Sequence, residues 1–313
     1  MKLPQWNPAL SATYETRPAL KGKLREDLLA LRHIFGLDLG RQPLGRSLGH
    51  CLPGSLVKDL LIVAIDVENP MVTQLEGDTH YEVGISILDT RDMQSSIQDE
   101  RADSKKSFDL LQTHQYCVGP EKYYKRVIWR YPFGDPKHTF IEVVRSRIKE
   151  LIRGRDVILV VHGGRWDLEF LRAASINLKP LYTIDTQKAA QHPLDLEYRI
   201  KSEQLLDVLD MSPFEPGLLH VAGNDANFTL RALLLIACLD VCSAPQLLEP
   251  AQLDLLFTLE QVARGPIFLD FYHAEAEIRL RRKIKLQKKE ENRKRAKERI
   301  RAKELRDAAN RSQ

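Results

Sequence analysis

The stretch LLIVAIDVE, residues 60–68, decides the fold of this chain. Residues 60–66 form a continuous apolar and β-branched run, which is typical of a central strand buried on both faces. Side chains at positions i and i+2 of a strand point to the same face, so Asp66 and Glu68 project together from its end. Two carboxylates held this close repel unless a cation lies between them, and they predict a Mg²⁺ or Mn²⁺ site. The alternative is a pair of solvated residues at a strand end.

The surrounding pattern predicts further strands and several helices. Strands are expected at 81–90, which alternates and ends in a turn signal, at 156–162 (DVILVVH), more weakly at 113–118 and 125–131, and at 181–186. Helices are expected at 139–153, 166–174 and 224–242, and an exposed polar loop with a little helix at 91–112. Strands that pair first and then alternate with helices predict an α/β domain of three layers with a mixed central sheet.

The chain is expected to have three parts. Residues 1–56 form an N-terminal arm broken by prolines, with one helix near 19–35 that docks on the body. Residues 57–245 form the main domain, and residues 246–313 a helical extension. The extension ends in a basic tail, because residues 275–313 hold 16 Lys/Arg and 7 Asp/Glu. This tail could contact a ribonucleoprotein partner or nucleic acid, act as a nuclear import signal, or simply be solvated.

Composition excludes several classes of protein. No apolar stretch approaches the roughly 18 residues that a membrane span needs. The first residues, MKLPQWNPALS, contain no apolar signal segment, so we expect a cytoplasmic or nuclear protein that is not secreted and does not contact a membrane. The four cysteines fit no zinc spacing.

A further carboxylate follows a second strong strand. Asp167 comes just after VILVVHGG, where Gly163 and Gly164 let the backbone turn sharply from strand into helix. Ligands bind at the carboxyl ends of parallel strands in α/β sheets, which favours a functional role for Asp167. The alternative is that its charge only supports the start of the helix.

The segment LLHVAGNDANFTLRALL, residues 218–234, is the most specific of the set. Gly223 and Asn224 predict a turn before an apolar helix, with Asp225 in the first helical turn and His220 on the preceding loop. That break would let the histidine approach the acid. The alternative is that Asn224 caps the helix and His220 is an ordinary loop residue.

Together these positions predict a two-metal phosphodiesterase. We expect Asp66, Glu68 and Asp225 to hold one ion, and Asp66 with Asp167 to place a second roughly 4 Å away. His220 has the natural pKa of a general base near neutral pH and would take the proton of the attacking water. The second ion would stabilise the leaving 3′ oxygen.

At these residues the chain resembles the DEDDh 3′–5′ exonucleases of the ribonuclease-H-like superfamily. Asp66-x-Glu68 is similar to the family's first motif, Asp167 to the second and His220-x₄-Asp225 to the third. Accessory positions agree at Glu82-x-Gly84, Asp185-Thr186 and LLDVLDM (205–211). The resemblance covers roughly residues 57–245 and looks closest to a fungal branch named for mRNA export and RNA silencing.

The resemblance implies a ribonuclease-H-like fold, two Mg²⁺ or Mn²⁺ ions and hydrolysis from the 3′ end of single-stranded nucleic acid, RNA in preference to DNA. The residues assigned to substrate binding are Trp166, as a stacking side chain, Asn69 and His162. Asn69-Pro70 departs from the residues that usually follow the first motif. A non-catalytic nucleic-acid or ribonucleoprotein adaptor of the same fold remains the alternative, and internal cutting is a third reading.

Overall fold

The structure is a computed structural model that describes residues 21–37, 59–70, 75, 79–98, 110–211, 218–242 and 248–267. The chain divides into two compact units, Met1–Ile267 and Phe268–Gln313, and every described residue lies in the first. The predicted basic tail and most of the N-terminal arm therefore lie outside the described residues. Among the described helices, none is both long enough and apolar enough to cross a membrane.

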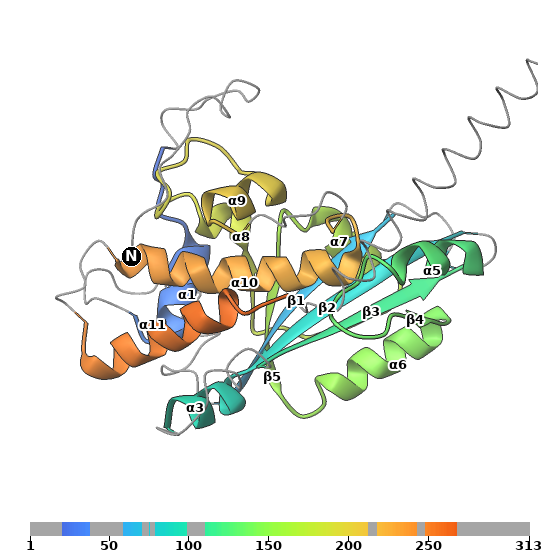
Figure 1. The fold of residues 1–313 in the computed structure, drawn as a ribbon, viewed down its shortest axis with the longest axis horizontal. Coiled ribbons are helices and arrows are strands. Elements are labelled where there is room, and N and C mark those ends of the chain that lie inside the picture. Colours follow the sequence, from blue (N-terminus) through green and yellow to red (C-terminus); the bar gives the residue numbers. More distant parts are fainter. Residues whose placement is uncertain are drawn as a thin grey trace, which may run out of the picture. The chain divides into compact units, whose positions relative to one another are not determined.

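Six strands form one mixed sheet in the order β4-β3-β2-β1-β5-β6 (Figure 1). The strands are β1 (Leu60–Glu68), β2 (Tyr81–Asp89), β3 (Leu111–Val118), β4 (Lys137–His138), β5 (Asp156–Val161) and β6 (Tyr182–Asp185). The apolar run at 60–66 lies in the central strand β1, which pairs antiparallel with β2 and parallel with β5. The expected mixed sheet is confirmed.

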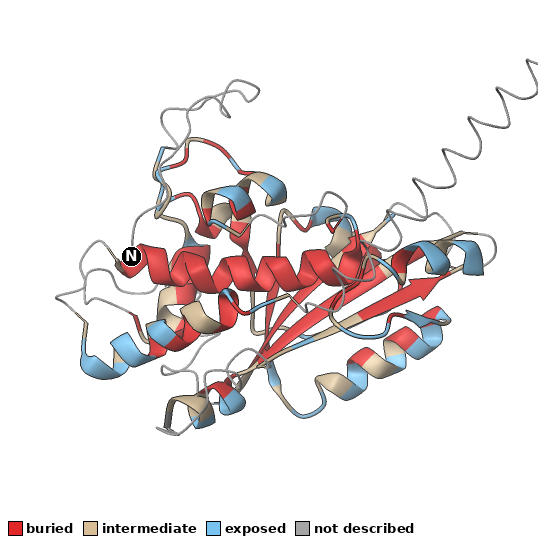
Figure 2. Cartoon of the chain, in the orientation of Figure 1, coloured by how far each residue is buried: buried red, intermediate tan, exposed pale blue. Residues whose placement is uncertain are grey.

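Helices cover both faces of the sheet. Helices α6 (Ile141–Leu151) and α7 (Arg165–Ala173) pack on the face that carries Val63, Ile65 and Val67 of β1. Helix α10 (Ala222–Val241) packs on the opposite face, against β1, β2 and β3. All 20 residues of α10 are buried, so the helix runs through the interior (Figure 2). The three-layer α/β architecture is confirmed, and the apolar sequence of α10 follows from its burial on every side.

The remaining described helices are shorter than α10. They are α1 (Glu26–Ile34), α3 (Thr90–Gln98), α5 (Glu121–Val127), α8 (Thr186–Ala189), α9 (Ser202–Val208) and α11 (Pro250–Ala263). The helix expected near 19–35 is α1, and it docks on the body as predicted. Its Asp27 side chain accepts a hydrogen bond from the Asp185 backbone N–H at 2.8 Å, and Arg32 pairs with Asp240 of α10 at 2.6 Å.

One local prediction is wrong. Residues 125–131 were expected to form a weak strand, but they belong to the end of α5 and the turn after it. Only Val127 and Tyr131 of this segment are buried, and its charged residues and Trp129 stay at or near the surface. The polar segment 91–112, expected to be an exposed loop with a little helix, opens with the helix α3, and residues 99–109 lie outside the described residues. The short edge strand β4 was not predicted.

Candidate active site

The end of β1 and the start of α10 meet because residue 84 has no side chain. In the β1–β2 register, Asp66 lies opposite Gly84, and Glu68 opposite Glu82. A Cβ added at Gly84 would fall 1.9 Å from the carbonyl carbon and oxygen of Ala222 in the first turn of α10. This close approach brings Asp225, one turn into α10, to the acidic end of β1.

His220, on the loop before α10, lies beside Glu68 and Asp225 and forms an acidic cluster with them. The His220 backbone N–H donates a hydrogen bond to Asp225 Oδ2 at 2.8 Å, and the ring Nδ1 lies 3.5 Å from Glu68 Oε1. One ligand atom from each of Glu68, His220 and Asp225 lies within 4.8 Å of the other two. The His220 side chain is 87% exposed, so the ring faces solvent from which a substrate can approach.

The break that frees His220 lies earlier than the sequence predicts. Gly223 and Asn224 are inside α10, whose N-cap is Val221, so the expected turn at Gly223-Asn224 and the capping alternative are both wrong. The chain instead turns at His220 itself, which has a φ of 62°. The amide nitrogen of Asn224 donates to the carbonyl oxygens of Arg130 and Leu218, both at 2.7 Å, and thereby holds this turn in place.

Asp167 joins the cluster from the other side of β1. Its Oδ1 accepts a hydrogen bond from the Val67 backbone N–H at 2.9 Å, between Asp66 and Glu68 in the chain. Gly163, with a φ of 67°, makes the turn before α7 as predicted. Asp185 fixes that turn, since its Oδ1 accepts from the backbone N–H groups of Gly163 and Gln187, each at 3.0 Å.

The carboxylates are poorly solvated and repel one another. Burial, followed by the charges of Asp225, Asp167 and Glu68, raises the pKa of Asp66 well above its usual value. Burial and the Glu68 charge raise the pKa of Asp225 to about 8, and burial raises that of Asp167 to about 6. Asp225 Oδ1 is buried and has no hydrogen-bond partner among the described residues. An unpaired buried oxygen within a repelling acidic cluster fits a divalent cation, which prefers oxygen ligands.

Hydrogen bonds made by Glu82 and Gln115 tie the start of α10 to the neighbouring strands. Glu82 Oε2 accepts from Gln115 Nε2 at 2.8 Å and from the Ala222 N–H at 3.4 Å, while Gln115 Oε1 accepts from the Gly223 N–H. Arg130 also holds the loop that carries His220, because its Nη2 donates a hydrogen bond to the Leu219 carbonyl oxygen. Sequence reasoning missed Gln115 and Arg130, because their partners lie about a hundred residues away and no local pattern marks them.

The three residues assigned to substrate binding lie in different surroundings. Trp166 is 44% exposed beside Asp167, with the Arg165 guanidinium 5.0 Å from its ring centre. Asn69 directly follows Glu68 and contacts His80, with Nδ2 and Nε2 3.0 Å apart. His162 points toward α8, where its Nδ1 lies 2.8 Å from Thr186 Oγ1, and burial lowers its pKa to about 4. Substrate contact by these residues stays a prediction.

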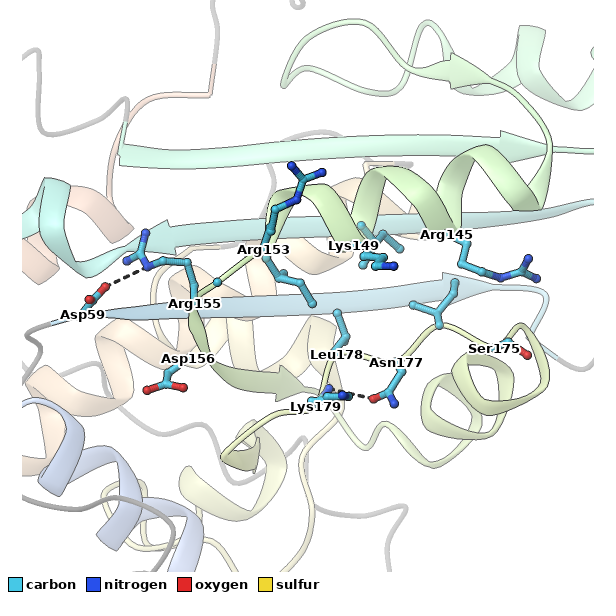
Figure 3. A pocket seen from close by; sticks show the side chains of 14 residues that line it. Asp59, Arg145, Lys149, Arg153, Arg155, Asp156, Ser175, Asn177, Leu178 and Lys179 are labelled. Atoms are coloured by element: carbon cyan, nitrogen blue, oxygen red, sulfur yellow. Dashed lines mark hydrogen bonds and ion pairs between the residues drawn. The ribbon is translucent and has the colours of Figure 1, made fainter.

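A pocket lies at the other end of the parallel strands (Figure 3). Asp59, Asp156 and Arg155 line it where β1 and β5 begin, and basic side chains from α6 surround it. It is separate from the acidic cluster, which lies where β1 ends. Since ligands of α/β sheets bind at the carboxyl ends of the strands, the acidic end is the candidate active site.

Comparison with known proteins agrees with this geometry. Residues 61–236 match the family model DEDDh_C, described as DNA polymerase III subunit epsilon-like, C-terminal domain. The match includes all five residues Asp66, Glu68, Asp167, His220 and Asp225. A search of curated proteins finds no significant match.

Proposed function

Since the chain belongs to the DEDDh family, we propose that it is a metal-dependent exonuclease that hydrolyses single-stranded nucleic acid from the 3′ end. The family implies a hydrolase acting on nucleic acid. The observation that carries the proposal is the convergence of Glu68, His220 and Asp225 within 4.8 Å, at the strand end where Asp66 and Asp167 also lie.

The donor set supports a two-ion site. Asp66, Glu68 and Asp225 would hold one divalent cation, and Asp66 with Asp167 a second, as the unpaired Asp225 Oδ1 and the mutual repulsion of the acids favour. When bound, Mg²⁺ or Mn²⁺ supplies the positive charge that attracts phosphate and stabilises the attacking and leaving oxygens.

The protein groups supply orientation and proton transfer. His220 accepts the proton of the attacking water through its exposed ring, and its backbone is held by the N–H hydrogen bond to Asp225. Asp167 is oriented by the Val67 N–H, which holds its carboxylate beside Asp66 and Glu68 at the end of β1. Trp166, beside it, offers an exposed ring for base stacking.

Preference for RNA over DNA is part of the proposal and rests on the similarity to the RNA-silencing branch. Comparison of RNA with DNA tests this preference, because the acids and His220 act on the phosphate, which RNA and DNA share.

Digestion of 5′-labelled single-stranded RNA and its DNA equivalent tests the proposal. With Mn²⁺ or Mg²⁺, we expect a ladder that shortens from the 3′ end, is lost in chelator and is absent in Asp66→Asn. Binding of RNA without any hydrolysis, in every metal tried, would instead support an adaptor that keeps the fold.

A further inference from the structure

A stack of two aromatic rings lies next to the acidic cluster. The rings of His80, just before β2, and Tyr123, on α5, are parallel, with centres 3.5 Å apart and planes within 2°. Asn69 contacts the same histidine from the residue that directly follows Glu68. Asn69 therefore connects the ring stack to the end of β1, where the acids lie.

Helix α5 is held against residues 79 and 80, the segment that precedes β2. Gly119, at a φ of 105°, packs so closely on residues 79 and 80 that an added Cβ would lie 2.2 Å from the Thr79 carbonyl oxygen. Tyr124 donates a hydrogen bond to the Pro136 carbonyl oxygen at 3.2 Å, which ties α5 to the segment before β4. Figure 1 shows α5 beside the sheet, next to β3 and β4.

Two basic side chains lie over the ring of Tyr123. Lys122 Nζ lies 4.9 Å, and the Arg126 guanidinium carbon 5.5 Å, from the centre of the Tyr123 ring. Both side chains are exposed, and within the described part of the chain no carboxylate pairs with them. Lys125 differs, because it forms an ion pair with Glu121 at 3.1 Å.

From these contacts we propose that Lys122 and Arg126 form a phosphate-binding site for the single strand whose 3′ end lies at the acidic cluster. The proposal rests on the proposed exonuclease function and identifies where the strand continues beyond the scissile bond. The acids repel the polyanion, so cations held nearby on a rigid ring stack offset that repulsion. Two exposed cations one helical turn apart can contact neighbouring backbone phosphates without reading the bases.

The test compares two double variants of the full chain in an Asp66→Asn background, so that the strand is not consumed. Lys122→Ala/Arg126→Ala removes the proposed site. Lys149→Ala/Arg153→Ala is the matched control, since it removes one exposed lysine and one exposed arginine with the same spacing at the pocket of Figure 3. Affinity for a labelled 12-nucleotide single strand is measured by anisotropy at several salt concentrations.

We expect the Lys122/Arg126 variant to bind the 12-mer roughly tenfold more weakly, with the slope of log affinity against log salt reduced by about 1.4, as two lost phosphate contacts require. The control should leave both unchanged. Equal losses in the two variants, or none in the first, would overturn the inference.

Hydrolysis of a dinucleotide by the protein with Asp66 intact separates this inference from the proposed function. A dinucleotide carries only the scissile phosphate and leaves Lys122 and Arg126 no further phosphate to contact, so its hydrolysis tests the exonuclease function alone. If this short substrate is hydrolysed but the affinity for the 12-mer is unchanged in the Lys122→Ala/Arg126→Ala variant, only the α5 site is wrong. If nothing is hydrolysed but 12-mer affinity still depends on the two residues, the exonuclease function is wrong and the binding site stands.

Discussion

Gly84 of β2 and Ala222 of α10 are in direct backbone contact, and a Cβ at Gly84 would lie 1.9 Å from the Ala222 carbonyl group. Gly84 is also the β-sheet partner of Asp66. The absence of one side chain therefore sets the distance between the helix that carries Asp225 and the strand that carries Asp66 and Glu68.

Substitution of Gly84 should damage the site and the fold together. Gly84→Ala forces α10 away from β2, and overpacking of this kind lowers the unfolding free energy by about 1–3 kcal/mol. Because Asp225 moves with the helix, Mn²⁺ affinity should fall as well. Urea unfolding and Mn²⁺ titration measure the two effects.

Gly134→Ala is the control for that experiment. Gly134 has a φ of 123°, but no atom lies within 4 Å of its added Cβ, so this variant carries backbone strain without the collision. It should keep its Mn²⁺ affinity. A Gly84→Ala protein that binds Mn²⁺ as tightly as the unaltered chain would show that the close contact does not position Asp225.

Gln115 should stabilise the start of α10 from β3. Gln115→Leu leaves the Gly223 N–H and the half-buried Glu82 carboxylate without this partner, which costs about 1–3 kcal/mol of unfolding free energy. Gln112→Leu on the same strand changes an exposed side chain and should shift stability by less than about 0.5 kcal/mol. Equal urea midpoints for the two variants would contradict this role.

His220 should matter for rate and not for stability. Its side chain is almost fully exposed, so His220→Ala should leave the melting temperature unchanged. Loss of a general base lowers the rate by typically 10²–10⁴-fold, which single-turnover hydrolysis at saturating metal would measure. Full rate across neutral pH in this variant would exclude His220 as the base.

The acids should make the metal-free protein less stable as the pH rises. The pKa of Asp225 is raised from 3.8 to about 8, so between these values the folded chain binds more protons than the unfolded chain. The unfolding free energy then falls as the pH increases through that window. The raised pKa values of Asp66 and Asp167 act in the same direction.

Divalent metal should reverse this trend, because it binds the deprotonated carboxylates. We expect the melting temperature in chelator to be lower at pH 8 than at pH 6, and the gain on adding Mn²⁺ to be larger at pH 8. Asp225→Asn should weaken both effects. Gains of equal size at pH 6 and pH 8 would show that metal binding is not coupled to these protons.

The sequence predicts the parts of the fold whose signals are local. β1 and β5 are continuous apolar runs, and α10 is a long apolar helix, so each is visible within its own segment. Asp66, Asp167 and Asp225 lie next to these apolar segments, so their positions near the ends of the elements could be predicted for the same reason. Residues 125–131 could not, because a few apolar residues among charges fit a strand or a helix equally well, and packing decides between them.

The features that the sequence could not predict depend on contacts between segments far apart in the chain. Gln115 and Arg130 reach the start of α10 from segments about a hundred residues away. The turn at His220 was expected at Gly223-Asn224, since glycine and asparagine are the usual turn residues. Gly223 instead lies inside α10, where an added Cβ would meet the side chains of Tyr131 and Gln115.

The most direct test of the central claim compares a linear single strand with its covalently closed circle, each incubated with the protein and Mn²⁺. We expect the linear strand to be degraded to mononucleotides, the circle to survive, and Asp66→Asn to leave both intact. Cleavage of the circle would show an endonuclease, and survival of both substrates in every divalent metal would contradict a hydrolytic role for the acidic cluster.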